Sequence, residues 1–105
     1  MVLHSFGSGN DGRLPQAGLI VVGGLLYGTT SQGGGSGCGG GGCGTVFSLD
    51  PNTGAETVLY SFQGAPLDGQ WPNGLTSVKN ALYGTTIFGG ASDHGTVFSL
   101  KKKPS

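Results

Sequence analysis

Short apolar segments alternate with turn residues along the chain. Largely apolar runs of strand length occur at residues 19–22, 25–30, 45–49 and 56–62. Gly23 and Gly24 predict a two-residue hairpin between the first two runs. Residues 50–54, with the sequence DPNTG, predict a tight turn between the last two. No window shows helical periodicity, and Gly is too frequent for a stable helix, so we expect an all-β chain.

The same motifs return in the second half of the chain in the same order. Residues 2–6 (VLHSF) return at 58–62 (VLYSF), and residues 26–30 (LYGTT) return at 82–86. The motif GTVFSL occurs at residues 44–49 and again at 95–100. Each repeat therefore contains four short strands, and the extra length of the first copy lies in the Gly-rich stretch 31–43. We expect this stretch to be a loop that folding does not require.

The predicted strands carry apolar residues on both faces. Along residues 45–49, Phe47 and Leu49 point one way and Val46 points the other. A strand of this kind belongs to a sheet that is covered on both sides. Four-stranded antiparallel units that recur about every 50 residues and stack face to face are typical of β-propeller blades.

Taken together, the motifs VLYSF, DGxxPxxGL, LYGTT and GTVFSL resemble the Gloeo_Verruco (GloVer) repeat of bacterial tandem-repeat proteins. The resemblance covers about residues 2–100. It implies a propeller-like fold and a location outside the cell or at the cell surface. It implies no established activity and no catalytic residues. The chain opens without the basic region and long apolar core of a signal peptide.

The predicted strands do not fill two complete four-stranded units. We expect a single repeat domain over residues 1–105, with a complete first blade at 11–62 and a second blade at 68–100 that lacks its last strand. Residues 2–6 repeat the missing strand. Two blades cannot close a ring, so we expect this segment to complete the second blade of a neighbouring copy.

The expected fold class is therefore all-β, with two four-stranded antiparallel β-propeller-type blades completed by strand exchange into an oligomeric propeller. Head-to-tail exchange produces a ring or a filament, and we favour a ring of three chains. The alternative is an excised fragment of a longer extracellular repeat protein.

The composition excludes two classes of partner. Only 10% of the residues are charged, and the formal net charge is zero. A nucleic-acid-binding protein needs a basic surface, whereas the basic run of this chain is confined to residues 101–103. No apolar stretch approaches the roughly 20 residues that span a membrane. We expect neither a nucleic-acid partner nor a membrane span.

Two cysteines, Cys38 and Cys43, flank four glycines in the Gly-rich loop. They could form a local disulfide, half of a metal site or two free thiols. A zinc site needs four ligands, and His4 and His94 are distant in the sequence. A disulfide is therefore favoured, and we expect no metal and no other cofactor. A bridge across so short a loop adds little stability.

Polar residues recur at the loop that enters each repeat. Asp11 and Asp68 are each followed by Gly, which is typical of turns, and repeated ligands for sugar hydroxyls or Ca²⁺ are the second interpretation. An aromatic ring beside polar groups can bind a sugar, although Trp71 could instead pack between blades. The candidate ligand-binding residues are Asp11, Arg13, Asp68, Gln70 and Trp71.

Residue types used in catalysis are present without a catalytic arrangement. Ser92, Asp93 and His94 are adjacent in sequence, and adjacency is not triad geometry. The glycine runs lack the Lys-Ser/Thr of a phosphate-binding loop. We therefore expect no catalytic residues and no enzyme. The leading hypothesis is a non-enzymatic, self-assembling repeat protein with a structural or ligand-binding role. The alternative is a carbohydrate-binding, lectin-like oligomeric propeller whose partners are glycans.

Overall fold

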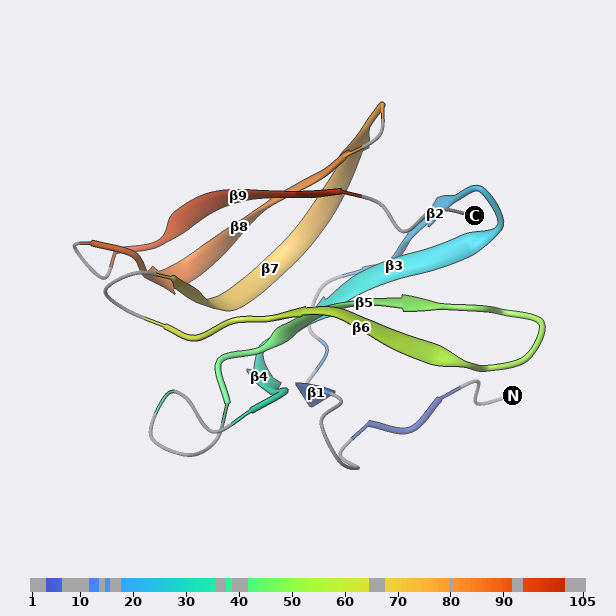
Figure 1. Cartoon of the computed structure of the whole chain (residues 1–105), viewed down its shortest axis with the longest axis horizontal. Helices are drawn as coiled ribbons and strands as arrows, with labels where there is room; N and C mark the ends of the chain where they lie inside the picture. Colours follow the sequence, from blue (N-terminus) through green and yellow to red (C-terminus); the bar gives the residue numbers. More distant parts are fainter. Residues whose placement is uncertain are drawn as a thin grey trace.

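The fold is all-β. The computed structural model describes residues 4–6, 12–13, 15, 18–35, 38, 42–64, 68–79, 81–91 and 94–101. Within these residues the strands pair antiparallel in two larger sheets and one short pair, and there is no α-helix. Figure 1 shows the two larger sheets packed against each other, with the short pair β1–β4 at one end. In the same residues no helix is long and apolar enough to cross a membrane.

The first sheet contains the four strands expected of the first repeat. Its strands are β2 (Ile20–Val22), β3 (Leu25–Thr30), β5 (Thr45–Leu49) and β6 (Glu56–Ser61), paired in that order. The turn from β5 to β6 is held by Asp50, whose Oδ1 accepts the backbone N–H of Asn52 at 2.8 Å. Its carbonyl oxygen accepts the N–H of Gly54, also at 2.8 Å. The predicted tight turn is thus confirmed.

The second sheet has three described strands, β7 (Gly69–Val78), β8 (Ala81–Gly89) and β9 (Thr96–Lys101). Its register repeats that of the first sheet. Leu26 faces Leu49 across β3 and β5, and the counterparts Leu82 and Leu100 face each other across β8 and β9. The repeat seen in the sequence is therefore a repeat of strand pairing.

The short pair β1 (Gly12–Arg13) and β4 (Gln32–Gly33) has a counterpart inside the second sheet. There, Gly69 and Gln70 at the start of β7 pair with the end of β8. The long β7–β8 ladder of the second repeat therefore corresponds to two separate ladders of the first, β1–β4 and β2–β3. The long β7 was not expected from the sequence.

The core lies between the inner faces of the two larger sheets. Tyr27, Val46 and Phe62 from the first repeat and Leu82 from the second form one buried cluster. The rings of Phe62 and Phe98 meet edge to face, with their centroids 5.0 Å apart. Each sheet therefore covers one side of the other.

Candidate functional site

Asp68, a candidate ligand, holds the connection between β6 and β7. Its Oδ2 accepts the hydroxyl of Tyr60 at 2.6 Å and the backbone N–H of Gln63 at 2.9 Å. Its Oδ1 accepts the N–H of Gly69 at 2.9 Å. Hydrogen bonds from nearby backbone N–H groups to an Asp carboxylate are typical of turns. This arrangement agrees with the first interpretation of Asp68, as a turn residue.

The contact with Asp68 also changes the acidity of Tyr60. The hydrogen bond to the carboxylate, with partial burial and the nearby negative charge, raises the pKa of the Tyr60 phenol to about 12. The unfolded chain has a phenol pKa near ~10. A raised pKa means that the neutral phenol stabilises the fold. That contribution is fully present below pH ~10 and is lost as the pH rises through about 12.

We expect Tyr60→Phe to lower the free energy of unfolding at pH 8 by about 0.5–1.5 kcal/mol, because one hydrogen bond is removed. The value belongs at the low end, since Tyr60 is partly exposed and solvent screens the interaction. Urea unfolding at pH 8 and at pH 11 measures the effect, which should shrink at the higher pH. A loss that stays the same at both values would contradict a pH-dependent contribution from Tyr60.

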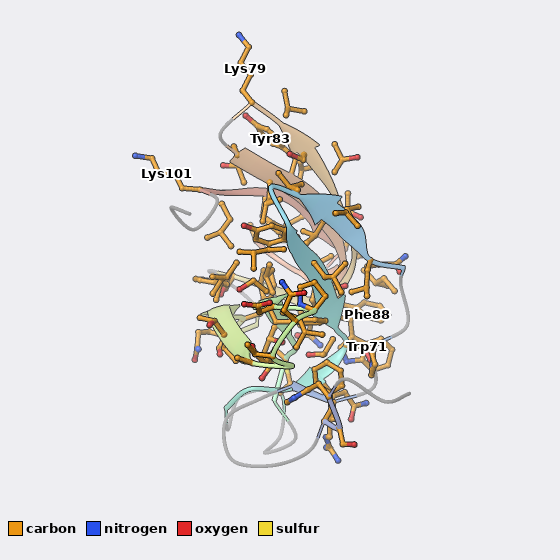
Figure 2. All side chains as sticks on the ribbon, turned by 90° about the vertical axis from the view of Figure 1, so that its right-hand side faces the viewer. Trp71, Lys79, Tyr83, Phe88 and Lys101 are labelled. Atoms are coloured by element: carbon orange, nitrogen blue, oxygen red, sulfur yellow. A yellow bond between two sulfur atoms is a disulfide. The ribbon has the colours of Figure 1, made fainter. Side chains whose placement is uncertain are left out.

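The neighbouring candidates contact other parts of the molecule. A Cβ on Gly64 would lie 3.2 Å from Gln70 Oε1 and 3.2 Å from both cysteine sulfurs, so Gln70 and the cysteines flank Gly64. The ring of Trp71 packs edge to face on Phe88, with the centroids 5.6 Å apart (Figure 2). Trp71 adopts a positive φ of 58°.

The described candidates for a sugar site contact different parts of the molecule. In the described part of the chain, Asp68, Gln70 and Trp71 have different neighbours. Arg13 is exposed on β1, and Asp11 lies outside the described residues. The Trp71 ring packs on Phe88, and the Trp71 backbone N–H donates to the carbonyl of Cys43 at 2.9 Å. The carbohydrate-binding hypothesis stays a prediction.

Cys38 and Cys43 are joined by a disulfide, with their Cα atoms 5.4 Å apart. Cys43 is fully buried in the core cluster, whereas Cys38 is exposed. The end of the Gly-rich loop is therefore part of the core. Removing the whole loop should lower stability, contrary to the expectation from its length. Among the described side chains no group of three His, Cys, Asp or Glu could hold a metal ion.

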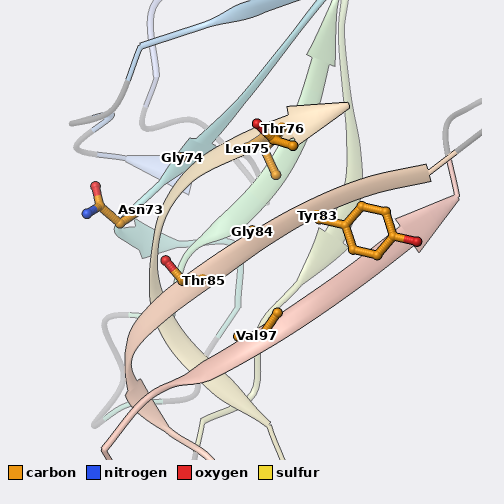
Figure 3. A pocket seen from close by; sticks show the side chains of 8 residues that line it. All are labelled: Asn73, Gly74, Leu75, Thr76, Tyr83, Gly84, Thr85 and Val97. Carbon is orange, nitrogen blue, oxygen red and sulfur yellow. The ribbon is translucent and has the colours of Figure 1, made fainter. Parts of the chain in front are cut away.

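A second candidate surface is the outer face of the second sheet, which we define by Tyr83, Thr85, Val97 and Ser99. These four positions are exposed on the side of β8 and β9 that faces away from the first sheet. A hollow of about 430 Å³ lies on this face, with Val97 and Tyr83 in its lining (Figure 3). Strand β9 bounds the face and, among the described strands, pairs with β8 alone.

Residues 4–6 lie against the outer face of the first sheet, which we define by Leu19, Leu26, Phe47 and Leu49. The Phe6 ring contacts the Phe47 ring edge to face at 5.1 Å. Figure 1 shows this segment, in blue, on the side of the first sheet away from β7–β9. Residues 4–6 are not part of any strand pairing, and residues 2–3 lie outside the described residues.

The packing of residues 4–6 repeats that of residues 60–62. His4 stacks edge to face on Phe6 at 4.7 Å, and Tyr60 stacks on Phe62 at 4.9 Å. Phe6 meets Phe47 at 5.1 Å, and Phe62 meets Phe98 at 5.0 Å. Residues 4–6 therefore occupy the same place on the first sheet that residues 60–62 occupy on the second.

These features define an all-β protein built from two copies of one repeat. The family model Gleo_Verruco, the Gloeobacter/Verrucomicrobia repeat, matches residues 1–105, and the chain belongs to this family. The resemblance seen in the sequence motifs is thus confirmed. No curated protein and no solved structure matches the chain.

Proposed function

We propose that the chain is a non-enzymatic building block that assembles with copies of itself by strand exchange into a propeller-type array. The observation that supports this proposal most directly is the difference between β5 and its counterpart β9. Strand β5 is paired on both sides, by β3 and β6. Strand β9 pairs with β8 alone among the described strands. An edge of unpaired N–H and C=O groups is a template for another strand.

Residues 2–6 are the proposed donor, because they repeat the sequence that follows β5. In the first sheet Val46 lies opposite Tyr60, and Thr45 lies opposite Ser61. The same register places Val97 of one copy opposite His4 of the next. Phe6 already contacts Phe47 of its own first sheet, as Phe62 contacts Phe98. Phe6, at the end of the donor segment, therefore holds the same place on the first sheet that Phe62 holds on the second.

This exchange is head to tail, because the donor segment and the acceptor edge are different parts of one chain. Such contacts close into a ring or extend into a filament, and we propose a closed ring of three chains. The Cys38–Cys43 disulfide supports a role outside the cell, since disulfides persist in oxidising compartments. In a longer protein of this repeat family, the next repeat of the same polypeptide would supply the strand instead.

The solution mass of the 105-residue chain tests the proposal. Light scattering is expected to show an oligomer, three times the chain mass of 10.4 kDa for the ring. Deleting residues 1–5 should yield a monomer, because the donated strand is lost while Phe6 stays on Phe47. A wild-type chain that remains monomeric, or a deletion that leaves the oligomer intact, would overturn strand exchange.

A peptide of residues 1–6 provides the matching control. Added in excess to the deletion variant, it should raise the melting temperature, because it can pair with the open edge of β9. It should leave the mass near that of one chain, because the free peptide links no second copy. A peptide without effect on melting would show that β9 does not accept this strand.

A further inference from the structure

The two sheets expose the same repeat positions to different extents. Tyr27 is 2% exposed and Val46 is fully buried at 0% in the first sheet. Their counterparts in the second sheet, Tyr83 and Val97, are 43% and 80% exposed. The strand register around both pairs is the same. The difference therefore comes from what lies beside each sheet: the first sheet is covered by the second, and the outer face of the second is open.

Two cavities of equal size lie at equivalent positions of the two repeats. One cavity of about 230 Å³ lies between the sheets and is lined by Val46, Tyr60, Phe62, Phe98 and Leu100, among others. A second, also of about 230 Å³, lies on the outer face of the first sheet. Its lining includes His4, Phe6, Phe47 and Leu49, the repeat counterparts of Tyr60, Phe62, Phe98 and Leu100. The wall that Val46 forms in the first cavity has no counterpart within the described lining of the second.

We infer that a second copy of this chain docks here, with its Val97 in the cavity formed by His4, Phe6, Phe47 and Leu49. This inference rests on the proposed function and names the sheet faces that meet. The outer face of the second sheet of one copy covers the outer face of the first sheet of the next. The contact repeats the one between the two sheets of a single chain.

One hydrogen bond between the two sheets of a chain can also form between two docked copies. Between the sheets of one chain, the backbone N–H of Gly74 donates to Thr29 Oγ1 at 3.2 Å. The counterparts are Gly18 and Thr85, and both are exposed. A Cβ on Gly18 would meet nothing within 4 Å. In the docked pair, Gly18 of one copy donates to Thr85 of the other.

The occupant of this cavity is a second copy of the 105-residue chain, because one chain carries both surfaces of the contact. A single chain carries both surfaces, yet its second sheet already covers the opposite side of its first sheet (Figure 1). Val97 therefore cannot reach the cavity on the outer face of the first sheet in its own chain. A head-to-tail contact between copies uses both surfaces once per chain, and it continues the packing that each chain already has.

Val97→Asp tests the face contact. A carboxylate forced into an apolar cavity disfavours docking, so we expect the association constant to fall at least tenfold. Val21→Asp is the matched control, because Val21 is a valine of the first sheet that is 71% exposed. Its counterpart Ser77 remains exposed although its face packs on the first sheet, so the docking leaves Val21 exposed. The control should assemble like the wild type, as measured by light scattering over a dilution series.

The folding of Val97→Asp is checked by circular dichroism. Val97 is highly exposed, so the spectrum of the diluted variant should match that of the diluted control. If the variant fails to fold, Val97→Thr replaces it, since the shape is kept while a hydroxyl enters the cavity. Val97→Thr should then weaken association several-fold.

Mixing two defective variants tests the head-to-tail arrangement. Val97→Asp retains residues 1–6 and the outer face of its first sheet, whereas the 1–5 deletion retains β9 and Val97. At a concentration at which each variant alone is monomeric, an equal mixture should form pairs of two chains and nothing larger. Failure of the mixture to pair would overturn the face contact.

The outcomes also separate this inference from the proposed function. If Val97→Asp assembles fully while the 1–5 deletion dissociates, the face contact is wrong and strand exchange stands. A monomeric wild-type chain would overturn both, and a partner other than a second copy would then cover this face.

Discussion

Leu82→Ala is expected to lower the free energy of unfolding by about 2–5 kcal/mol, the range for deleting a buried leucine side chain. Leu82 is fully buried at the contact between the two sheets. Small domains have a total stability of only about 5–15 kcal/mol, so this loss is a large share of it. Urea unfolding followed by circular dichroism measures the change, in the monomeric variant that lacks residues 1–5.

Leu26→Ala is the matched control, since Leu26 is the counterpart of Leu82 in the same register. Leu26 is only half-buried on the outer face of the first sheet. In the monomeric background its loss should be clearly smaller. In the assembled wild-type background the difference should narrow, because a second copy would cover Leu26. Equal losses in the monomer would contradict the assignment of an inner and an outer face.

The strands of the first sheet were predictable from local sequence. Strands β3 and β5 have the bounds that the apolar runs indicate, and β2 and β6 differ from them by one residue. Alternation along residues 45–49 also indicated two covered faces, and both faces of β5 are buried. These features depend on residues that are close together in the chain, so the local hydrophobic pattern predicts them.

The long strand β7 was missed for a physical reason. Its middle contains Pro72 and Gly74, which signal loops in a sequence. Among the described strands, β7 lies at the edge of its sheet, where a Pro costs no ladder hydrogen bond on its open side. The pairing shifts register between Pro72 and Leu75, which accommodates the irregular segment. Sequence patterns alone do not distinguish such an edge from a loop.

The candidate surfaces were only partly predictable. The turn role of Asp68 was accessible from its position before Gly69, and its hydrogen bonds agree with that role. The motif around Val97 could not predict that Val97 is exposed, because Val46 lies in an identical motif and is buried. What differs is the neighbouring sheet.

Reducing the Cys38–Cys43 disulfide is expected to lower the free energy of unfolding by about 2 kcal/mol, the low end for disulfides, because the closed loop is short. Substituting Cys43 by Ala should cost roughly 1 kcal/mol more under the same reducing conditions, since a fully buried sulfur is also removed. Thermal and urea unfolding, with and without reductant, measure both steps.

Cys38→Ala separates the crosslink from the packing. Cys38 is exposed, so under reductant this variant should unfold like the reduced wild type. Only Cys43→Ala should be less stable, because its side chain contributes to the core beside Tyr27 and Val46. If the two alanine variants have the same stability under reductant, the Gly-rich loop acts only through its crosslink. Its C-terminal end would then contribute nothing measurable to the core.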